Sequence, residues 1–158
     1  MLRKLFATLG VTGAALLGAV VPASAQPDAA PHCQHGSSYG TIVKTAPVSA
    51  ISGGARVGTV ELCRDSAYNY WGFVIYNDEM TASQYAQVFL QIYRDGSWTS
   101  EVTCDSTGGN DHVGPGHTRC WTPKVGGVSG RYTFRAWSDK YSSHTGALLA
   151  QGYTVIAR

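Results

Sequence analysis

The sequence predicts an all-β protein, either an antiparallel β-sandwich or a small barrel of about eight strands, tied together by two disulfides. Short runs rich in Val, Ile, Thr and Tyr, several with apolar and polar residues in alternation, recur from residue 40 to residue 157. Turn signals rich in Gly, Asp, Asn and Pro separate these runs at near-regular spacing. The chain has 4 cysteines, an even number, as disulfide-tied domains usually have.

The N-terminus has the pattern of an export signal, which we expect to be cleaved after Ala25. Arg3 and Lys4 form a basic start, an apolar run follows, and Pro22-Ala-Ser-Ala25 ends in small residues. Gln26, and not a cysteine, follows the expected cut, so the pattern does not favour a lipid anchor. We therefore predict a secreted, extracellular protein that has no membrane association after cleavage.

The charge balance argues against nucleic acid as a ligand. The formal net charge is +2, and Arg3 and Lys4 alone supply this excess. A neutral exported part exerts no long-range attraction on polyanions or anionic membranes. We expect a flexible N-terminal segment at 26–39 that contains Cys33, followed by one β domain at 40–158 that is a monomer.

All the cysteines lie in the exported part, where an oxidising environment favours disulfides. Three pairings are possible, and we favour Cys33–Cys63 with Cys104–Cys120 because each joins cysteines that are neighbours in the sequence. The chain lacks the Cys-x-x-Cys spacing of zinc knuckles, so we predict neither a thiol-bound metal nor any cofactor.

The first half of the domain contains three strand-like segments, at 40–51, 57–63 and 68–76. In the second segment, Val60 and Leu62 alternate with polar residues and should point inward. In the third, Trp71, Phe73 and Ile75 share one face, which we expect to be core. Tyrosines on its opposite face could bind sugar or protein, although strands favour tyrosine in any case.

A β-hairpin is predicted around Asp95-Gly96, because this dipeptide suits a type I′ turn with positive φ at both central positions. The flanking strands are expected at 86–93 and 98–104, with further strands at 118–122, 130–138 and 150–157. We expect the inward residues of the hairpin to be Val88, Leu90 and Ile92 on the first strand and Trp98, Val102 and Cys104 on the second.

The segment from Gly130 to Ser138 opens with Gly-x-Tyr and then alternates, with Tyr132, Phe134 and Ala136 on one face. This pattern resembles the sixth strand of immunoglobulin-like sandwiches, in which the tyrosine forms a corner. The resemblance implies an immunoglobulin-like fold and no particular activity.

Several short motifs resemble a group of small exported actinobacterial proteins of unknown function. They are Gly58-Thr-Val-Glu-Leu62, Trp71-Gly72, Thr122-Pro-Lys-Val125 and the segment from Arg131 to Trp137. In that group a Thr-Val-Glu-Leu-Arg-Tyr-Ser strand precedes a Cys and a Trp, and a Tyr-Thr-Pro-Met-Val stretch follows. This chain departs from the pattern at Cys63, where the group has Arg, and it has no Cys between Ala67 and Trp71. The resemblance implies an exported β domain and no activity.

The loop between Cys104 and Cys120 contains the densest cluster of polar side chains capable of chemistry. Its carboxylates and imidazoles suit a divalent metal, and a ribonuclease-like site could combine Glu101 with a histidine and a phosphate clamp. Equally, its Asp, Asn and Gly residues could serve turns alone. Gly-x-Ser-x-Gly, the commonest hydrolase motif, is absent from the sequence. The candidate binding residues in the loop are Asp105, Asn110, Asp111, His112, His117 and Arg119.

Three functions are compatible with these patterns. The leading one is a non-catalytic binding or inhibitor-like module that contacts a secreted protein through the disulfide-closed loop, whose shape is fixed before binding. The second is a small secreted hydrolase or metal-binding protein that uses the same loop. The third is a carbohydrate- or cell-wall-binding module that uses aromatic side chains. We assign no catalytic residue, and the candidate aromatic contacts are Tyr70, Trp98, Trp121 and Trp137.

Overall fold

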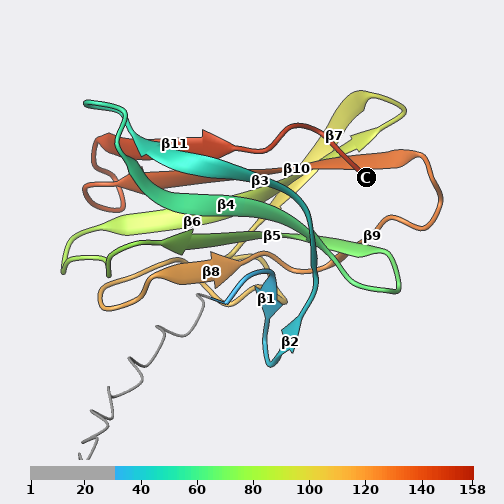
Figure 1. Cartoon of the computed structure of the whole chain (residues 1–158), viewed down its shortest axis with the longest axis horizontal. Helices are drawn as coiled ribbons and strands as arrows, with labels where there is room; N and C mark the ends of the chain where they lie inside the picture. The colour runs from blue at the N-terminus through green and yellow to red at the C-terminus, as the bar shows by residue number, and fades with distance from the viewer. Residues whose placement is uncertain (1–30) are drawn as a thin grey trace, which may run out of the picture.

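The computed structural model describes residues 31–158, which form a large antiparallel sheet and a small one. The large sheet curls into a half-barrel (Figure 1). Its strand order is β7-β6-β10-β11-β3-β4-β5-β8, with β9 beside β5. The all-β, antiparallel, disulfide-tied architecture is therefore confirmed. The strands are β3 (Thr41–Ala50), β4 (Arg56–Arg64), β5 (Asn69–Tyr76), β6 (Tyr85–Arg94), β7 (Ser97–Thr103), β8 (Arg119–Trp121), β9 (Val125–Gly126), β10 (Tyr132–Tyr141) and β11 (Leu148–Tyr153).

The small sheet is a hairpin of β1 (Gln34–His35) and β2 (Ser38–Tyr39). Residues 34–39, which lie in the segment expected to be flexible, form this hairpin, and the Cys33–Cys63 disulfide joins its start to β4. The Cys33–Cys63 and Cys104–Cys120 disulfides are both present, which confirms the predicted pairing. The predicted signal at 1–25 lies outside the described residues. Within residues 31–158, none of the chain forms a helix that could cross a membrane.

The main core lies inside the curl and contains the predicted inward residues of β4 and β6. On β5 the sequence prediction named the wrong face for the main core. Tyr70, Val74 and Tyr76 point into this core, and not the predicted set of Trp71, Phe73 and Ile75. Trp71 and Phe73 lie on the other face, where they form a second buried cluster with the Cys33–Cys63 disulfide. Both faces of β5 are thus buried, so alternation alone could not say which face the main core would take.

The hairpin at Asp95-Gly96 is confirmed, with φ of 51° at Asp95 and 82° at Gly96. The inward face predicted for its second strand is only partly right. Trp98 pairs with Tyr93 while Ser100 pairs with Ile92, which leaves Thr99 as a bulge. Because one extra residue reverses the side-chain alternation, Trp98 points outward with 59% of its surface exposed.

Candidate functional site: the outer face of the sheet

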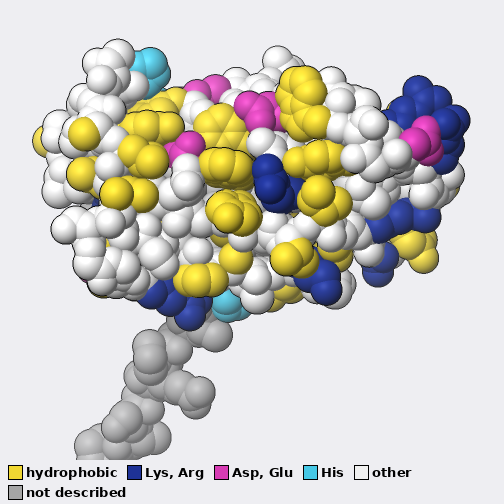
Figure 2. All heavy atoms as spheres, turned by 90° about the horizontal axis from the view of Figure 1, so that it is seen from above, with side chains coloured by type: hydrophobic (Ala, Val, Ile, Leu, Met, Phe, Trp, Pro, Cys, Tyr) yellow, Lys and Arg dark blue, Asp and Glu magenta, His cyan; other side chains and the backbone are white. Residues whose placement is uncertain are grey.

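Strands β7, β6, β10 and β11 share an outer face that points away from the main core. Val88, Leu90 and Ile92 of β6 are buried on the inner side, so the residues between them point outward. The strand registers then place these outward residues beside partners on the neighbouring strands. Figure 2, which views the molecule from the side of β11 and β3, shows hydrophobic side chains gathered around a basic one, with acidic side chains beside them.

Two rows of aromatic side chains cross this outer face. In the first row Trp137 of β10 is in register with Phe89 of β6 and with Tyr153 of β11. The rings of Trp137 and Tyr153 lie 5.2 Å apart, and Tyr153 is 53% exposed. The second row pairs Tyr93 with Trp98. Phe89 and Tyr93 are four residues apart on β6, so the rows are about 13 Å apart.

A polar row lies between the two aromatic rows. Arg135 is in register with Gln91, and Gln91 with Glu101. The Nε of Arg135 donates to Oε1 of Gln91 at 2.8 Å, and the Gln91 amide donates to Glu101 at 3.2 Å. The Arg135 guanidinium carbon also lies 5.1 Å from the Trp137 ring centre and 5.3 Å from that of Tyr153. Cation–π contacts at these distances orient the aromatic pair.

A second polar row, centred on Asp139, flanks the first aromatic row on its other side. The Trp137 indole N–H donates to Asp139 Oδ1 at 2.7 Å, and the Gln151 amide donates to the same oxygen at 3.0 Å. The Tyr141 hydroxyl donates to Asp139 Oδ2 at 3.1 Å. Partial burial, together with the Asp139 charge, raises the pKa of Tyr141 and keeps it a donor. Aromatic and polar rows thus alternate along the strands in a connected network.

The loop between Cys104 and Cys120 closes one end of the outer face. The Tyr85 hydroxyl donates to Asp105 Oδ2 at 2.9 Å, and the Gln87 amide donates to the same oxygen. The rings of His112 and His144 each lie 4.6 Å from the Tyr85 ring. Burial, followed by the hydrogen bond to Asp105, raises the pKa of Tyr85. These contacts anchor the loop to the sheet.

Within the loop, His112 meets two carboxylates. Its Nδ1 lies 2.6 Å from Asp111 Oδ1 and 3.5 Å from Asp105 Oδ1. The backbone N–H of His112, followed by hydrogen bonds to Asp105 and to the His112 side chain, lowers the pKa of Asp111. One ligand atom from each of the three side chains lies within 4.8 Å of the others, so a divalent cation could find ligands here.

The remaining loop candidates line a hollow of about 330 Å³ next to this cluster. His117, Arg119 and Asn110 contribute to its wall, as do Asp111 and His112. The structure therefore brings both histidines and Arg119 to one hollow. Glu101, which a ribonuclease-like site would combine with these histidines, does not line this hollow and instead accepts a hydrogen bond from Gln91 on the outer face.

The four predicted aromatic contacts do not form one surface. Trp98 and Trp137 lie on the outer face, but Trp121 of β8 packs against the second buried cluster. Tyr70 is fully buried and its ring stacks on Phe134 at 4.4 Å, so its prediction as an exposed aromatic contact is wrong. Tyr93, Tyr153 and Asp139 also lie on the outer face and were not predicted from the sequence. Alternation in 130–138 did place Arg135 and Trp137 opposite the core side, but their neighbours depend on strand order.

Comparisons of the chain with protein-family models, with curated proteins and with solved structures give no match.

Proposed function

We propose that this protein is a secreted, non-catalytic carbohydrate-binding domain whose binding surface is the outer face of β7, β6, β10 and β11. The observation that carries the proposal is the alternation of aromatic and polar rows across these strands. The loop from Cys104 to Cys120 would form the wall at one end of that surface.

A sugar ring matches such alternating rows chemically. Its C–H faces are apolar and stack on aromatic faces, while its hydroxyl rim exchanges hydrogen bonds with carboxylates, amides and guanidinium groups. A sugar chain lying along the strands would meet an aromatic row, a polar row and a second aromatic row about 13 Å beyond the first. Trp and Tyr have few rotatable bonds, so ordering them on binding costs little conformational entropy.

The loop from Cys104 to Cys120 fits a supporting role better than an inhibitor-like one. Its backbone is bonded into the sheet: Asp111 N–H donates to the Cys104 carbonyl at 3.0 Å, and Val113 N–H to the Ala86 carbonyl at 2.8 Å. Val113 is fully buried. These bonds hold the loop against the sheet, as a wall at the end of the binding surface requires.

The N-terminal signal pattern and the two disulfides support an extracellular setting. The short motifs that resemble small exported actinobacterial proteins make bacterial cell-wall polysaccharide the first ligand to test. An immunoglobulin-like relationship, suggested by Gly130 and Tyr132, stays a prediction.

Binding of the disulfide-bonded protein to insoluble peptidoglycan, chitin, cellulose and xylan, measured by co-sedimentation, tests the proposal. We expect binding to at least one polysaccharide, and about tenfold weaker binding for Trp137→Ala and for Tyr153→Ala. Tyr39→Ala is the matched control, because Tyr39 is 63% exposed on β2, which is not part of the outer face. Absence of binding, or an equal loss in the control, would contradict the proposal.

A second candidate function, hydrolysis, is favoured by the pairing of Asp111 with His112 beside His117 and Arg119. A carboxylate that orients an imidazole is a common arrangement for general acid–base catalysis. If the loop hydrolyses a polymer, His112→Ala should abolish turnover and leave polysaccharide binding intact. Trp137→Ala should have the reverse effect.

A further inference from the structure

A second hollow, of about 410 Å³, lies at the opposite end of β5 from the loop between Cys104 and Cys120. It lies between the end of β4, the start of β5, the turn at residue 128 and the C-terminal residue. The residues that line it are Arg64, Tyr68, Tyr70, Val128 and Arg158. None of them belongs to the outer face.

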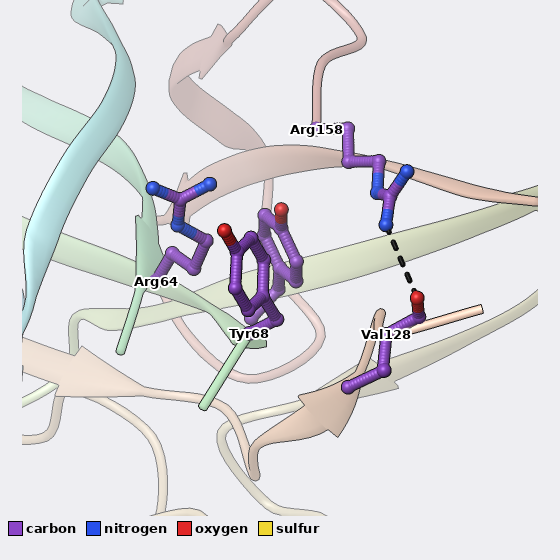
Figure 3. A pocket seen from close by; sticks show the side chains of 5 residues that line it. Arg64, Tyr68, Val128 and Arg158 are labelled. Atoms are coloured by element: carbon purple, nitrogen blue, oxygen red, sulfur yellow. Dashed lines mark hydrogen bonds between the residues drawn. The ribbon is translucent and has the colours of Figure 1, made fainter. Parts of the chain in front are cut away.

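Two arginines dominate the charge of this hollow. Arg64 and Arg158 stand on either side of Tyr68 (Figure 3). The Arg64 guanidinium carbon lies 4.8 Å from the Tyr68 ring centre, and Arg158 donates to the carbonyls of Gly127 at 3.1 Å and Val128 at 3.3 Å. Neither guanidinium forms an ion pair with any carboxylate among residues 31–158. The neighbouring Asp65 is instead paired with Lys124.

The hydroxyl of Tyr70 in this hollow has no hydrogen-bond partner among the described residues, although Tyr70 is fully buried. Hydrogen bonding to the Tyr70 oxygen is the largest cause of the raised pKa of Arg64, yet the contact is too long or too bent to count as a hydrogen bond of normal geometry, and the Tyr70 O–H itself is not donated to any described residue. Buried hydroxyls are nearly always paired, so the unpaired Tyr70 hydroxyl on the wall of this hollow has its O–H free to donate to a bound acceptor.

We propose that this hollow binds a small organic oxyanion, a carboxylate or a phosphate monoester, through Arg64, Arg158 and the Tyr70 hydroxyl. Guanidinium groups bind both kinds of oxyanion by charge-assisted, often bidentate hydrogen bonds. The Tyr70 hydroxyl would donate to a further oxygen. The Tyr68 ring and the exposed Val128 side chain would contact the apolar part of the ligand, and the volume suits a small molecule. This site is independent of the proposed carbohydrate surface.

Calorimetric titration of the disulfide-bonded protein with phenyl phosphate, benzoate, inorganic phosphate and neutral benzyl alcohol tests the proposal. Phenyl phosphate or benzoate should bind at least tenfold more tightly than benzyl alcohol. The tightest binder among phenyl phosphate, benzoate and inorganic phosphate shows whether the site prefers a phosphate ester, a carboxylate or free phosphate. Arg64→Gln and Arg158→Gln should each weaken the anion about tenfold. Arg56→Gln, at the other end of β4, is the matched control and should leave affinity unchanged.

Tyr70→Phe separates a ligand-binding role from a merely structural one. Removal of an unpaired buried hydroxyl should leave the melting temperature unchanged or raise it, while the anion binds severalfold more weakly. The proposal is overturned if benzyl alcohol binds as tightly as the anions, if no anion binds at millimolar concentration, or if Tyr70→Phe leaves anion affinity unchanged. An equal loss of affinity in Arg56→Gln would also overturn it.

Discussion

Cys104, just after β7, is bonded to Cys120 of β8, so a single disulfide joins the two end strands of the sheet order. The curl of the sheet brings these ends together without a continuous hydrogen-bonded ladder between them. Gly72 of β5 contributes, because a Cβ there would lie 3.1 Å from a Val88 methyl group and 3.2 Å from the Phe89 carbonyl of β6. Close packing, one disulfide and the hydrogen bonds between Val113 and Ala86 of β6 therefore hold the two edges of the half-barrel together.

Replacement of both Cys104 and Cys120 by Ala should lower the free energy of unfolding by about 3 kcal/mol, because the bond closes a loop of 16 residues. Urea denaturation of the double variant under non-reducing conditions measures the change. An unchanged midpoint would show that the packing of β5 on β6 suffices to close the half-barrel.

Glu61 fastens the N-terminal hairpin to β4 by hydrogen bonds. It is fully buried and accepts a bond from the Cys33 backbone N–H at 2.9 Å and another from the His32 ring. Glu61→Ala should cost about 3 kcal/mol, because it leaves a cavity and an unpaired N–H. His32→Ala, at a side chain that is 52% exposed, should cost less than about 1 kcal/mol. Equal effects in thermal denaturation would contradict this account.

Asp65 should make stability depend on pH in the acid range. Desolvation opposes the shift, but hydrogen bonds from Asn69 and Lys124 outweigh it and lower the pKa of Asp65 from 3.8 to about 2. A lowered native pKa means that its contribution is complete well above pH 3.8 and is lost as the pH falls toward 2. Because the side chain is partly exposed, we expect about 1 kcal/mol.

Asp65→Asn should therefore flatten the dependence of the unfolding free energy on pH between pH 4 and pH 2, a range set by the native and unfolded pKa values. Lys124→Gln is the control, because it removes one donor and leaves the bonds from Asn69; its effect should be smaller. A slope in Asp65→Asn that equals that of the wild type would assign the acid sensitivity to another group.

Gly40 allows the N-terminal hairpin to pack on the second buried cluster. An added Cβ would overlap the Trp71 indole and lie 2.7 Å from the Arg64 carbonyl. We expect Gly40→Ala to destabilise the protein by about 2 kcal/mol, as overpacking of a filled site does. Gly126→Ala is the control, because its Cβ would meet Asn69 at 3.8 Å, an ordinary contact. The melting temperature of Gly40→Ala should fall below that of the wild type, while that of Gly126→Ala should stay close to it. Equal melting temperatures for the two variants would contradict the prediction.

Features encoded within a few residues were predictable from the sequence. Asp95-Gly96 predicted its turn because few other dipeptides tolerate two positive φ values, and the spacing of the cysteines predicted both disulfides. The outward position of Trp98 was not predictable, since the bulge at Thr99 leaves no mark in the alternation. The row through Trp137 depends on β10 lying between β6 and β11, a pairing of distant segments that local patterns do not specify.

The most direct test of the carbohydrate-binding account is a titration followed through the indole N–H signals of the 4 tryptophans. Trp98 and Trp137 lie on the outer face, whereas Trp71 and Trp121 belong to the cluster beneath the N-terminal hairpin. Addition of a soluble oligosaccharide, taken from the polysaccharide that the protein binds, should shift the Trp98 and Trp137 signals and leave the Trp71 and Trp121 signals in place. Saturable binding that shifts Trp121 or Trp71 while Trp137 stays fixed would contradict the account.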